Sequence, residues 1–412
     1  MRFKLENNIK RIEKYVFYLL IFLIPSNLAK HWPQLWSYIH GILIDYLIPS
    51  LYLTDILILS LLIFWLLRLK PKIINIKPSL FLKKINFKNN WVYLLAFLLL
   101  FYSCFKALNP PVALYKLLKI FEFTFFILYI KYNPSIKKDI NNITKALSFS
   151  IIFQSLLSLA QWLKQGSIFS YLFLGEQPYN LSTLGIKKIS FLGQLKAPPL
   201  GTTPHPNMLA GFLVVSLSLI ILFQKKSLLK KLSLLLGIIA LSLTFSLPAY
   251  LAFLSFLFLI FKLKLKKFYP GLSLLFLVLL YLSFSKFSDP SSISKRLKLT
   301  EIGLKMGLSS PITGVGLNNF IPRMEEFGII EANYRFLQPV HNIFLLILSE
   351  TGLAGLILFF KALNLKKTKS LYLPLGLILF LGLFDHYFFT LQQGLLTLSL
   401  ILGISLSKNS KK

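Results

Sequence analysis

Few residues in this sequence are of the kinds that disulfides, metal clusters and paired acidic catalysts require. Among 412 residues there are one cysteine, five histidines and 14 acidic residues, against 46 Lys and Arg. The lone Cys104 excludes an intramolecular disulfide and leaves the redox compartment undetermined. The chain also lacks a Gly-x-x-x-x-Gly-Lys-Ser/Thr phosphate loop, an Asp-x-Asp pair and a clustered set of His and Cys ligands. We therefore expect no nucleotide, no bound metal and no other cofactor.

The net charge of +32 raises the question of a nucleic-acid partner. No helix-turn-helix, zinc module or aromatic-basic module accompanies this charge, so specific nucleic-acid binding is not expected. Lysines gather instead in every second connection between apolar runs, for example in residues 70–88, 225–231 and 361–369. An excess of Lys and Arg on the cytoplasmic side sets membrane topology, and such clusters are favourable beside anionic lipid head groups.

Long apolar runs dominate the sequence, since 55% of the residues are hydrophobic and 39 are Phe. A run of about 20 residues spans the hydrocarbon core as a helix. The runs are continuous rather than alternating, which favours helices over a barrel. We predict an all-α, polytopic integral protein of the cytoplasmic (inner) membrane, a single membrane domain over residues 1–412 with both termini cytoplasmic. About twelve transmembrane helices are expected, at residues 15–29, 51–68, 91–108, 112–130, 143–163, 207–224, 230–246, 248–264, 268–287, 341–361, 371–389 and 391–407.

Two connections on the outer side are long enough to carry a functional site. They are residues 164–206 and the larger loop 288–340, which precedes the tenth span and is the more polar of the two. Long loops over a rigid scaffold are where binding and catalytic residues concentrate. Residues 32–50 are also apolar, and we expect them to form an interfacial helix or a half-span.

The most informative local pattern begins at the end of the larger loop with His341-Asn342, followed by Gly352 and Gly355. At about 100° per residue, Gly352 falls close to the line of His341 on a helix, and Gly355 lies near the same line. The pattern predicts a histidine at the outer mouth of a helix whose glycines let a neighbouring helix pack closely. Glu350 falls on the opposite face, so it is not expected to act with His341.

This arrangement resembles the signature of the O-antigen ligase and O-antigen polymerase superfamily. Three further segments are similar to elements of the same family in the same order. They are residues 202–210 around Pro206-Asn207, residues 296–320 with Gly314 and Gly316, and Asp385-His386-Tyr387 followed by Gln392-Gln393-Gly394. The resemblance covers about residues 140–407, and the earlier spans agree with it only in hydropathy.

The resemblance implies glycosyl transfer outside the membrane, without nucleotide or metal. The implied donor is an undecaprenyl-diphosphate-linked glycan, and the implied acceptor is a hydroxyl of another glycan or of a lipid-linked core sugar. The difference between a ligase and a polymerase lies in the acceptor, which the sequence leaves open. The other expected partner is the lipid bilayer itself.

Such a transfer requires a base for the attacking hydroxyl and cations for the leaving diphosphate. His341 suits the first role because imidazole titrates near neutral pH. Arginine suits the second because its forked donors match phosphate oxygens. The candidate diphosphate- and substrate-binding residues are Arg296, Arg335, Arg323, Lys116, His205, Asn207 and Asn342.

One departure from the family pattern bears on activity. Many members carry Thr-x-Ser-Arg at the outer end of a middle span, and that arginine is thought to bind the diphosphate. The corresponding stretch here begins at Thr244 and has Leu247 in the arginine's place. Either another loop cation substitutes, or the chain is a weak or altered enzyme.

Simpler structural roles stand beside several of these assignments. A histidine at a helix end can be a capping residue, and His205 before Pro206-Asn207 is sufficient as a turn and N-cap. Asp385 and His386 can simply hydrogen-bond to each other, and Arg296 can be a solvated loop charge. In the fourth span, a pair between Lys119 and Glu122 is the plainer expectation, with Lys116 nearer the outer surface.

Two functions of other classes remain open from the sequence. A lipid-linked oligosaccharide flippase or other transporter fits twelve spans equally well, although transporters tend to show internal repeats and polar sites near mid-membrane. A non-catalytic partner of a glycan assembly complex would fit the missing arginine. Binding of the donor without transfer would favour the second of these.

Overall fold

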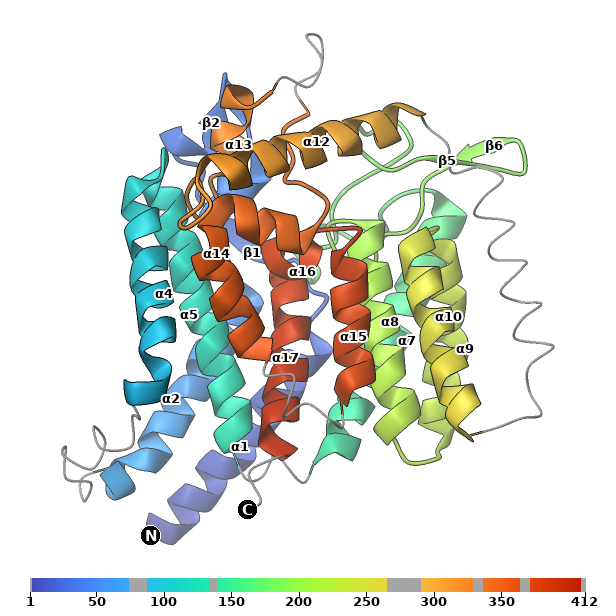
Figure 1. Ribbon diagram of the computed structural model, residues 1–412. Helices are drawn as coiled ribbons and strands as arrows, with labels where there is room; N and C mark the ends of the chain where they lie inside the picture. Colours follow the sequence, from blue (N-terminus) through green and yellow to red (C-terminus); the bar gives the residue numbers. More distant parts are fainter. Residues whose placement is uncertain are drawn as a thin grey trace.

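The computed structural model describes residues 2–73, 87–133, 139–264, 290–328, 336–363 and 371–408. Most of the helices stand side by side as a bundle, while α12 lies across one end of it (Figure 1). The helix α1 begins, and α17 finishes, at the opposite end. The longer helices are α1 (Arg2–Phe22), α2 (Leu53–Ile73), α4 (Phe87–Lys106), α5 (Pro110–Tyr132), α7 (Ile140–Lys164), α8 (Pro206–Phe223), α9 (Leu228–Leu243), α10 (Leu247–Lys264), α12 (Pro290–Ser309), α14 (Ile343–Leu363), α15 (Tyr372–Gly382) and α17 (Gln392–Lys408).

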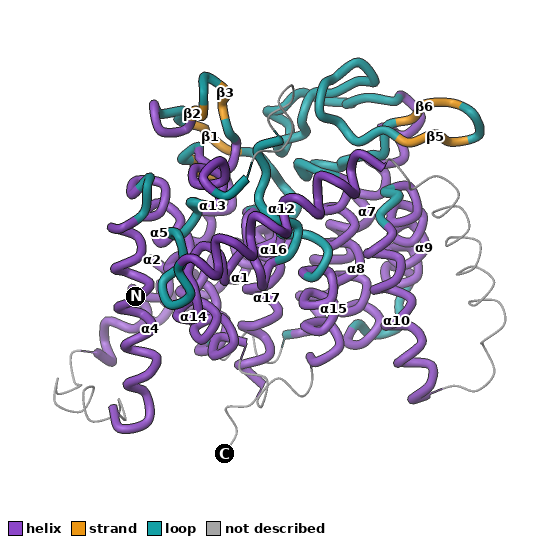
Figure 2. The backbone as a smooth tube through the Cα atoms, turned by 45° about the horizontal axis from the view of Figure 1, so that its top comes forward, coloured by secondary structure: helices purple, strands orange, loops and turns teal. Residues whose placement is uncertain are grey.

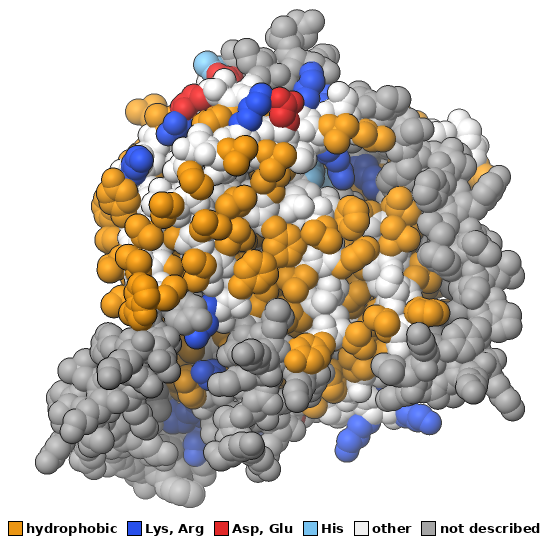
Figure 3. Space-filling view, viewed as in Figure 1, with side chains coloured by type: hydrophobic (Ala, Val, Ile, Leu, Met, Phe, Trp, Pro, Cys, Tyr) orange, Lys and Arg blue, Asp and Glu red, His pale blue; other side chains and the backbone are white. Residues whose placement is uncertain are grey.

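The helical, membrane-embedded character that the sequence predicts is confirmed in outline. Each predicted span overlaps one of these helices except residues 268–287, which fall outside the described residues. The predicted spans 15–29 and 371–389 are too long at their C-terminal ends, since α1 ends at Phe22 and α15 at Gly382. By length and hydropathy, α7, α8 and α14 suffice to cross a membrane, and four shorter apolar helices lie in α4, α10, α15 and α17. Figure 3 shows hydrophobic side chains over the middle of the bundle, with charged side chains towards its ends. The predicted number of spans is not established by these helices.

Helix α8 is the centre of the bundle. Its sequence is apolar all round, and such a helix is stable only when neighbours cover it on every side. It packs against α7, α9, α10, α15 and α17, and its side chains form the middle of the main hydrophobic core. Its start is fixed locally, because Pro206 occupies the first turn and His205 is the N-cap. The core therefore positions the residues at the head of α8.

Residues 32–50 form strands and short 3-10 turns rather than the predicted interfacial helix. Strand β1 (Ala29–His31) pairs antiparallel with β4 (Ser50–Tyr52), and β2 (Tyr38–Ile39) pairs with β3 (Ile42–Leu43). Pro33, Gly41 and Pro49 interrupt any helix in this stretch, so the prediction from hydropathy alone was wrong. These strands lie at the same end of the molecule as α12 (Figure 2).

The larger predicted loop is mostly folded. Residues 290–309 form α12, and α13 (Phe320–Arg323) follows it. One face of α12 buries Leu299, Ile302 and Met306 in a second hydrophobic cluster that also contains Val340 and Leu346. This cluster joins α12 to the beginning of α14.

Helix α14 is broken at Gly352, and a loop segment of the chain fills the break. Gly352 has φ 60° and ψ −160°, which is not helical. Residues 311–316 satisfy the backbone groups that the break releases. The hydrogen bonds join Val315 N to Ser349 O (2.9 Å), Gly316 N to Glu350 O (2.9 Å), Leu353 N to Pro311 O (2.8 Å) and Ala354 N to Ile312 O (3.1 Å). In a membrane, such a broken helix is tolerated only where other protein groups bond the freed backbone.

This break corrects the role predicted for the glycines. Gly352 permits the non-helical backbone conformation at the break and lets the backbone of Ile312 approach closely. It does not mediate contact between two continuous helices. Gly314 has φ 67° and lies against the backbone of Glu350, and Gly316 has φ 118°. A Cβ on Gly355 would meet Thr351 of its own helix first.

Replacing Gly352 or Gly314 with alanine should therefore destabilise the protein strongly. The new Cβ would lie 2.4 Å from Ile312 C or 2.2 Å from Glu350 C, at a φ that L-residues avoid. We expect a loss of about 2 kcal/mol or more, visible as a lower midpoint of thermal unfolding in detergent. Gly376→Ala in α15 is the matched control, because nothing lies within 4 Å of its Cβ position. Equal midpoints for Gly352→Ala and Gly376→Ala would contradict this account.

Candidate functional site

Three polar segments meet at the end of the bundle that α12 covers. His205 and Asn207 stand at the head of α8, His341 precedes α14, and Asp385 and His386 follow α15. His341 Nδ1 lies 3.3 Å from Asp385 Oδ1, and His386 Nε2 lies 3.9 Å from the same oxygen. The rings of His341 and His386 are 5.2 Å apart between centroids. We refer to these five residues as the His–Asp cluster.

The head of α8 brings His205 and Asn207 into this cluster. His205 Nδ1 accepts a hydrogen bond from Asn207 N at 3.1 Å, so the N-cap role predicted for His205 is confirmed. The Asn207 side chain donates to Asp385 Oδ2 at 3.0 Å. Burial lowers the pKa of His205 to about 4, and this histidine is therefore neutral at physiological pH.

Asn342 fixes His341 by capping the helix that follows it. Its Oδ1 accepts hydrogen bonds from Phe344 N (2.9 Å) and Leu345 N (3.0 Å), which the first turn of α14 would otherwise leave unpaired. Its Nδ2 donates to Leu383 O at 3.3 Å, just after α15. Asn342 thus ties together the two segments that carry His341 and Asp385. These contacts are structural.

Asp385 is the centre of the cluster. Oδ1 accepts from His386 N at 2.8 Å as well as from His341, while Oδ2 accepts from Asn207. Burial by itself raises the pKa of this carboxyl, but the hydrogen bond from His341 and the neighbouring histidines outweigh burial and hold the pKa well below its ordinary value. A carboxylate can only accept hydrogen bonds, so the His341 nitrogen that faces it carries the proton. His341 Nε2 is then left with a lone pair.

His386 is held on its other side. Its Nδ1 lies 2.7 Å from Thr390 Oγ1, and burial lowers its pKa to about 3. Lys116 Nζ donates to the carbonyl oxygens of Phe389 (2.7 Å) and Thr390 (3.4 Å), in the short helix α16 (Tyr387–Thr390). The structure therefore directs Lys116 to this backbone and not to the cluster. Lys119 pairs with Glu122 as expected, and also with Asp55.

A lysine that the sequence did not single out lies close to the cluster. Lys187, from the loop after α7, donates to Phe245 O at 2.6 Å and to Thr244 O at 3.4 Å. Burial and, to a smaller degree, the charge of Arg296 lower its pKa to about 7, against the opposing effect of Asp385. Each of these effects requires proximity. Lys187 and Arg296 therefore share one electrostatic region with the His–Asp cluster.

The loop that carries Lys187 is held by aromatic contacts. Strands β5 (Ile189–Phe191) and β6 (Gln194–Lys196) form a hairpin directly after it. Phe245 stacks on Trp162 of α7 at 5.6 Å between ring centroids and meets Phe191 of the hairpin edge-on at 5.8 Å. Sequence reasoning gave no reason to prefer Lys187 over other loop lysines, except that it lies in one of the two long outer loops.

The structure separates the predicted arginines. Arg296 in α12 lies near the cluster, since its charge also lowers the pKa of His205. Arg323 is paired with Glu326, with NH2 2.6 Å from Oε2, on α13 and the turn after it. Arg335 lies outside the described residues. Of the three, Arg296 is the one whose charge acts on the cluster, at His205 and His386.

His341, Asp385 and His386 also satisfy the geometry of a potential metal site among the described residues, since their ligand atoms lie within 4.8 Å of one another. The donor set argues for hydrogen bonding instead. Both oxygens of Asp385 already accept N–H groups, and a cation there would have to displace the His341 proton. The arrangement fits an oriented imidazole better than a metal ligand set.

Comparison with known proteins bears on the central part of the chain. Residues 207–360 match the family model described as O-antigen ligase. The matched segment contains Asn207, Arg296, His341 and Asn342, whereas Lys187 and Asp385 lie outside it. No curated protein matches the chain. Over residues 207–360, the resemblance to the O-antigen ligase and polymerase superfamily that the sequence elements indicate is thus confirmed.

Proposed function

We propose that this protein transfers a glycan from an undecaprenyl-diphosphate carrier to a hydroxyl of an acceptor sugar, as a surface-polysaccharide ligase or polymerase. The reaction takes place at the end of the bundle that holds the His–Asp cluster, which positive-inside topology assigns to the outer face. The observation that carries the proposal is an imidazole oriented by a carboxylate, His341 on Asp385, beside two cations.

His341 is the general base in this proposal. Its Nε2 takes the proton of the acceptor hydroxyl while the hydroxyl oxygen attacks the anomeric carbon of the donor sugar. Asp385 holds the ring in the required tautomer and stabilises the imidazolium that forms. The bond between the anomeric carbon and the diphosphate oxygen breaks, and the electron pair leaves with the diphosphate. This step requires neither nucleotide nor metal.

Lys187 and Arg296 stabilise the leaving diphosphate. Cations aimed at the oxygen where charge develops lower the barrier in a partly dry site. Lys187 is bonded to the carbonyls of Thr244 and Phe245, the element in which Leu247 stands where relatives have arginine. A cation is therefore supplied at that place by another loop. This favours an active enzyme over a non-catalytic partner.

The test is transfer by purified protein reconstituted with an undecaprenyl-diphosphate glycan from its own host. His341→Ala should abolish transfer, and Asp385→Asn should reduce the rate about 10²-fold or more, because the ring loses its orienting acceptor. His40→Ala is the matched control, since His40 is an exposed histidine paired with Glu325. Wild-type activity in His341→Ala would remove the base from the mechanism. Donor binding without transfer by the wild type would favour the transporter or the partner role.

The second prediction concerns the pH dependence of kcat/KM for the donor. With a pKa of about 7, Lys187 is charged below neutrality and loses its charge above it, so affinity for the diphosphate should fall as pH rises through 7. Lys187→Arg should keep the charge and extend activity to higher pH. Lys187→Gln should lower kcat/KM about 10- to 100-fold at pH 6.

The exposed neighbour Lys188 provides the control for this experiment. Lys188→Gln changes the net charge of the same loop equally and should leave the profile as in the wild type. An alkaline limb that stays unchanged in Lys187→Arg would show that Lys187 does not hold the donor.

A further inference from the structure

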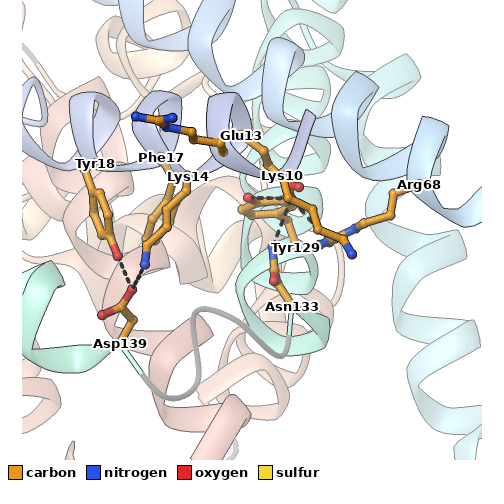
Figure 4. A pocket seen from close by; sticks show the side chains of 10 residues that line it. Lys10, Glu13, Lys14, Phe17, Tyr18, Arg68, Tyr129, Asn133 and Asp139 are labelled. Carbon is orange, nitrogen blue, oxygen red and sulfur yellow. Dashed lines mark hydrogen bonds and ion pairs between the residues drawn. The ribbon is translucent and has the colours of Figure 1, made fainter. Parts of the chain in front are cut away.

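A second polar site lies at the end of the bundle opposite to the His–Asp cluster. A cavity of about 310 Å³ opens between α1, α2, the end of α5 and the start of α7 (Figure 4). Four of its lining side chains are cationic and two are carboxylates: Lys10, Arg11, Lys14, Arg68, Glu13 and Asp139. The positive-inside pattern assigns this end to the cytoplasm.

The carboxylate of Glu13 is held by hydrogen bonds and an ion pair from the cavity wall. Glu13 is 3% exposed, and its Oε1 accepts from Tyr129 Oη at 2.9 Å and from Asn133 Nδ2 at 3.0 Å. Arg68 NH2 lies 3.3 Å from the same oxygen. Glu13 therefore anchors the guanidinium of Arg68 at the cavity. The other N–H groups of Arg68 stay available as donors.

The carboxylate of Asp139 is likewise held by an ion pair and a hydrogen bond. Asp139 Oδ2 lies 2.7 Å from Lys14 Nζ and also accepts from the Tyr18 hydroxyl. Figure 4 shows Lys14 and Tyr18 reaching this carboxylate together from α1. A lysine ammonium has three donors, so the pairing with Asp139 leaves Lys14 able to bind an anion as well.

The cavity consequently carries surplus positive charge. Arg68 and Lys14 are paired, whereas no described residue forms an ion pair with Lys10, and Arg11 donates to Tyr15. Figure 4 shows Lys10 and Arg68 extending towards each other from α1 and α2. Two like charges that converge repel each other, and an anion between them removes the repulsion.

We propose that this cavity binds the phosphate of an anionic phospholipid head group. Basic pockets between membrane helices on the cytoplasmic side suit such head groups. The two helices that supply these cations also carry exposed apolar residues, since Leu66, Leu67 and Ile12 are each about half exposed. A lipid satisfies both features, with its phosphate in the cavity and its acyl chains along α1 and α2. This site is separate from glycan transfer and stands whether or not the proposed reaction is correct.

The experiment measures lipid binding to the delipidated full-length protein in detergent, by native mass spectrometry and by the thermal unfolding midpoint. Phosphatidylglycerol should bind and raise the midpoint, whereas phosphatidylcholine should bind about tenfold or more weakly. Lys10→Gln should weaken phosphatidylglycerol binding about fivefold, and adding Arg68→Gln should weaken it by about the same factor again. Inorganic phosphate is the second arm. If phosphate matches the lipid at equal concentration, the anion site stands but its ligand is soluble, and the lipid assignment is overturned.

The paired variant Lys225→Gln/Lys226→Gln is the matched control, since it removes two exposed charges at the same end but outside the cavity. It should leave phosphatidylglycerol affinity within about twofold of the wild type. Equal weakening in both double variants would mean diffuse attraction to a basic surface and would overturn the site. Lys10→Gln is the variant least expected to disturb folding, because the Lys10 side chain is exposed and its loss breaks no ion pair of the described residues. Unchanged affinity in that variant, with a wild-type midpoint, would also overturn the proposal.

Discussion

The exchange of backbone hydrogen bonds between residues 311–316 and the broken helix α14 determines the geometry of the end that holds the His–Asp cluster. A peptide group left unpaired inside a bundle costs several kcal/mol, so the break at Gly352 and the inserted segment require each other. The segment follows α12 directly, and the first half of α14 follows His341 directly. The insertion therefore fixes α12, with Arg296, relative to His341. The glycines at 314 and 352 are needed because two backbones approach each other there.

The carboxylates at the two ends of the bundle are compensated by different groups. At the end that α12 covers, Asp385 is surrounded by three histidines, and its charge is met by N–H donors rather than by a buried arginine. The charges of Lys187 and Arg296 add to the positive potential of this end. At the other end, Glu13 and Asp139 hold cations against the wall of a cavity. In both places the carboxylate organises its surroundings, and the surplus charge is positive.

The sequence was informative where a role depends on neighbouring residues in the chain. His205 before Pro206-Asn207 predicted an N-cap, and His341-Asn342 predicted a histidine at the mouth of a helix; both follow from local helix chemistry. Most of the apolar runs gave the helices to within a few residues, whereas α1 begins well before its predicted span and α15 ends well before the end of its own. Hydropathy could not distinguish strands from a half-span in residues 32–50, because burial and apolar composition are the same for both.

Features that depend on tertiary contacts were not predictable. The helical wheel assumed one continuous helix from His341 to Gly355, and only the inserted segment reveals why the helix breaks. Lys116 looked available on a helical face, yet two carbonyls of α16, far away in the sequence, take its ammonium. Lys187 is one of 46 basic residues, and it is distinguished only by the fold, which brings its loop to Phe245.

In the proposed reaction, a lysine from another loop takes the place of the relatives' arginine, and this changes more than the position of a charge. Arginine stays protonated at any physiological pH, whereas a buried lysine shifts its pKa readily. With burial bringing the pKa of Lys187 to about 7, the free site is only partly charged at neutrality. A bound diphosphate would favour the charged form, so in the proposed reaction donor binding takes up a proton. In the proposed reaction, the leaving-group cation is thus created by the donor that needs it.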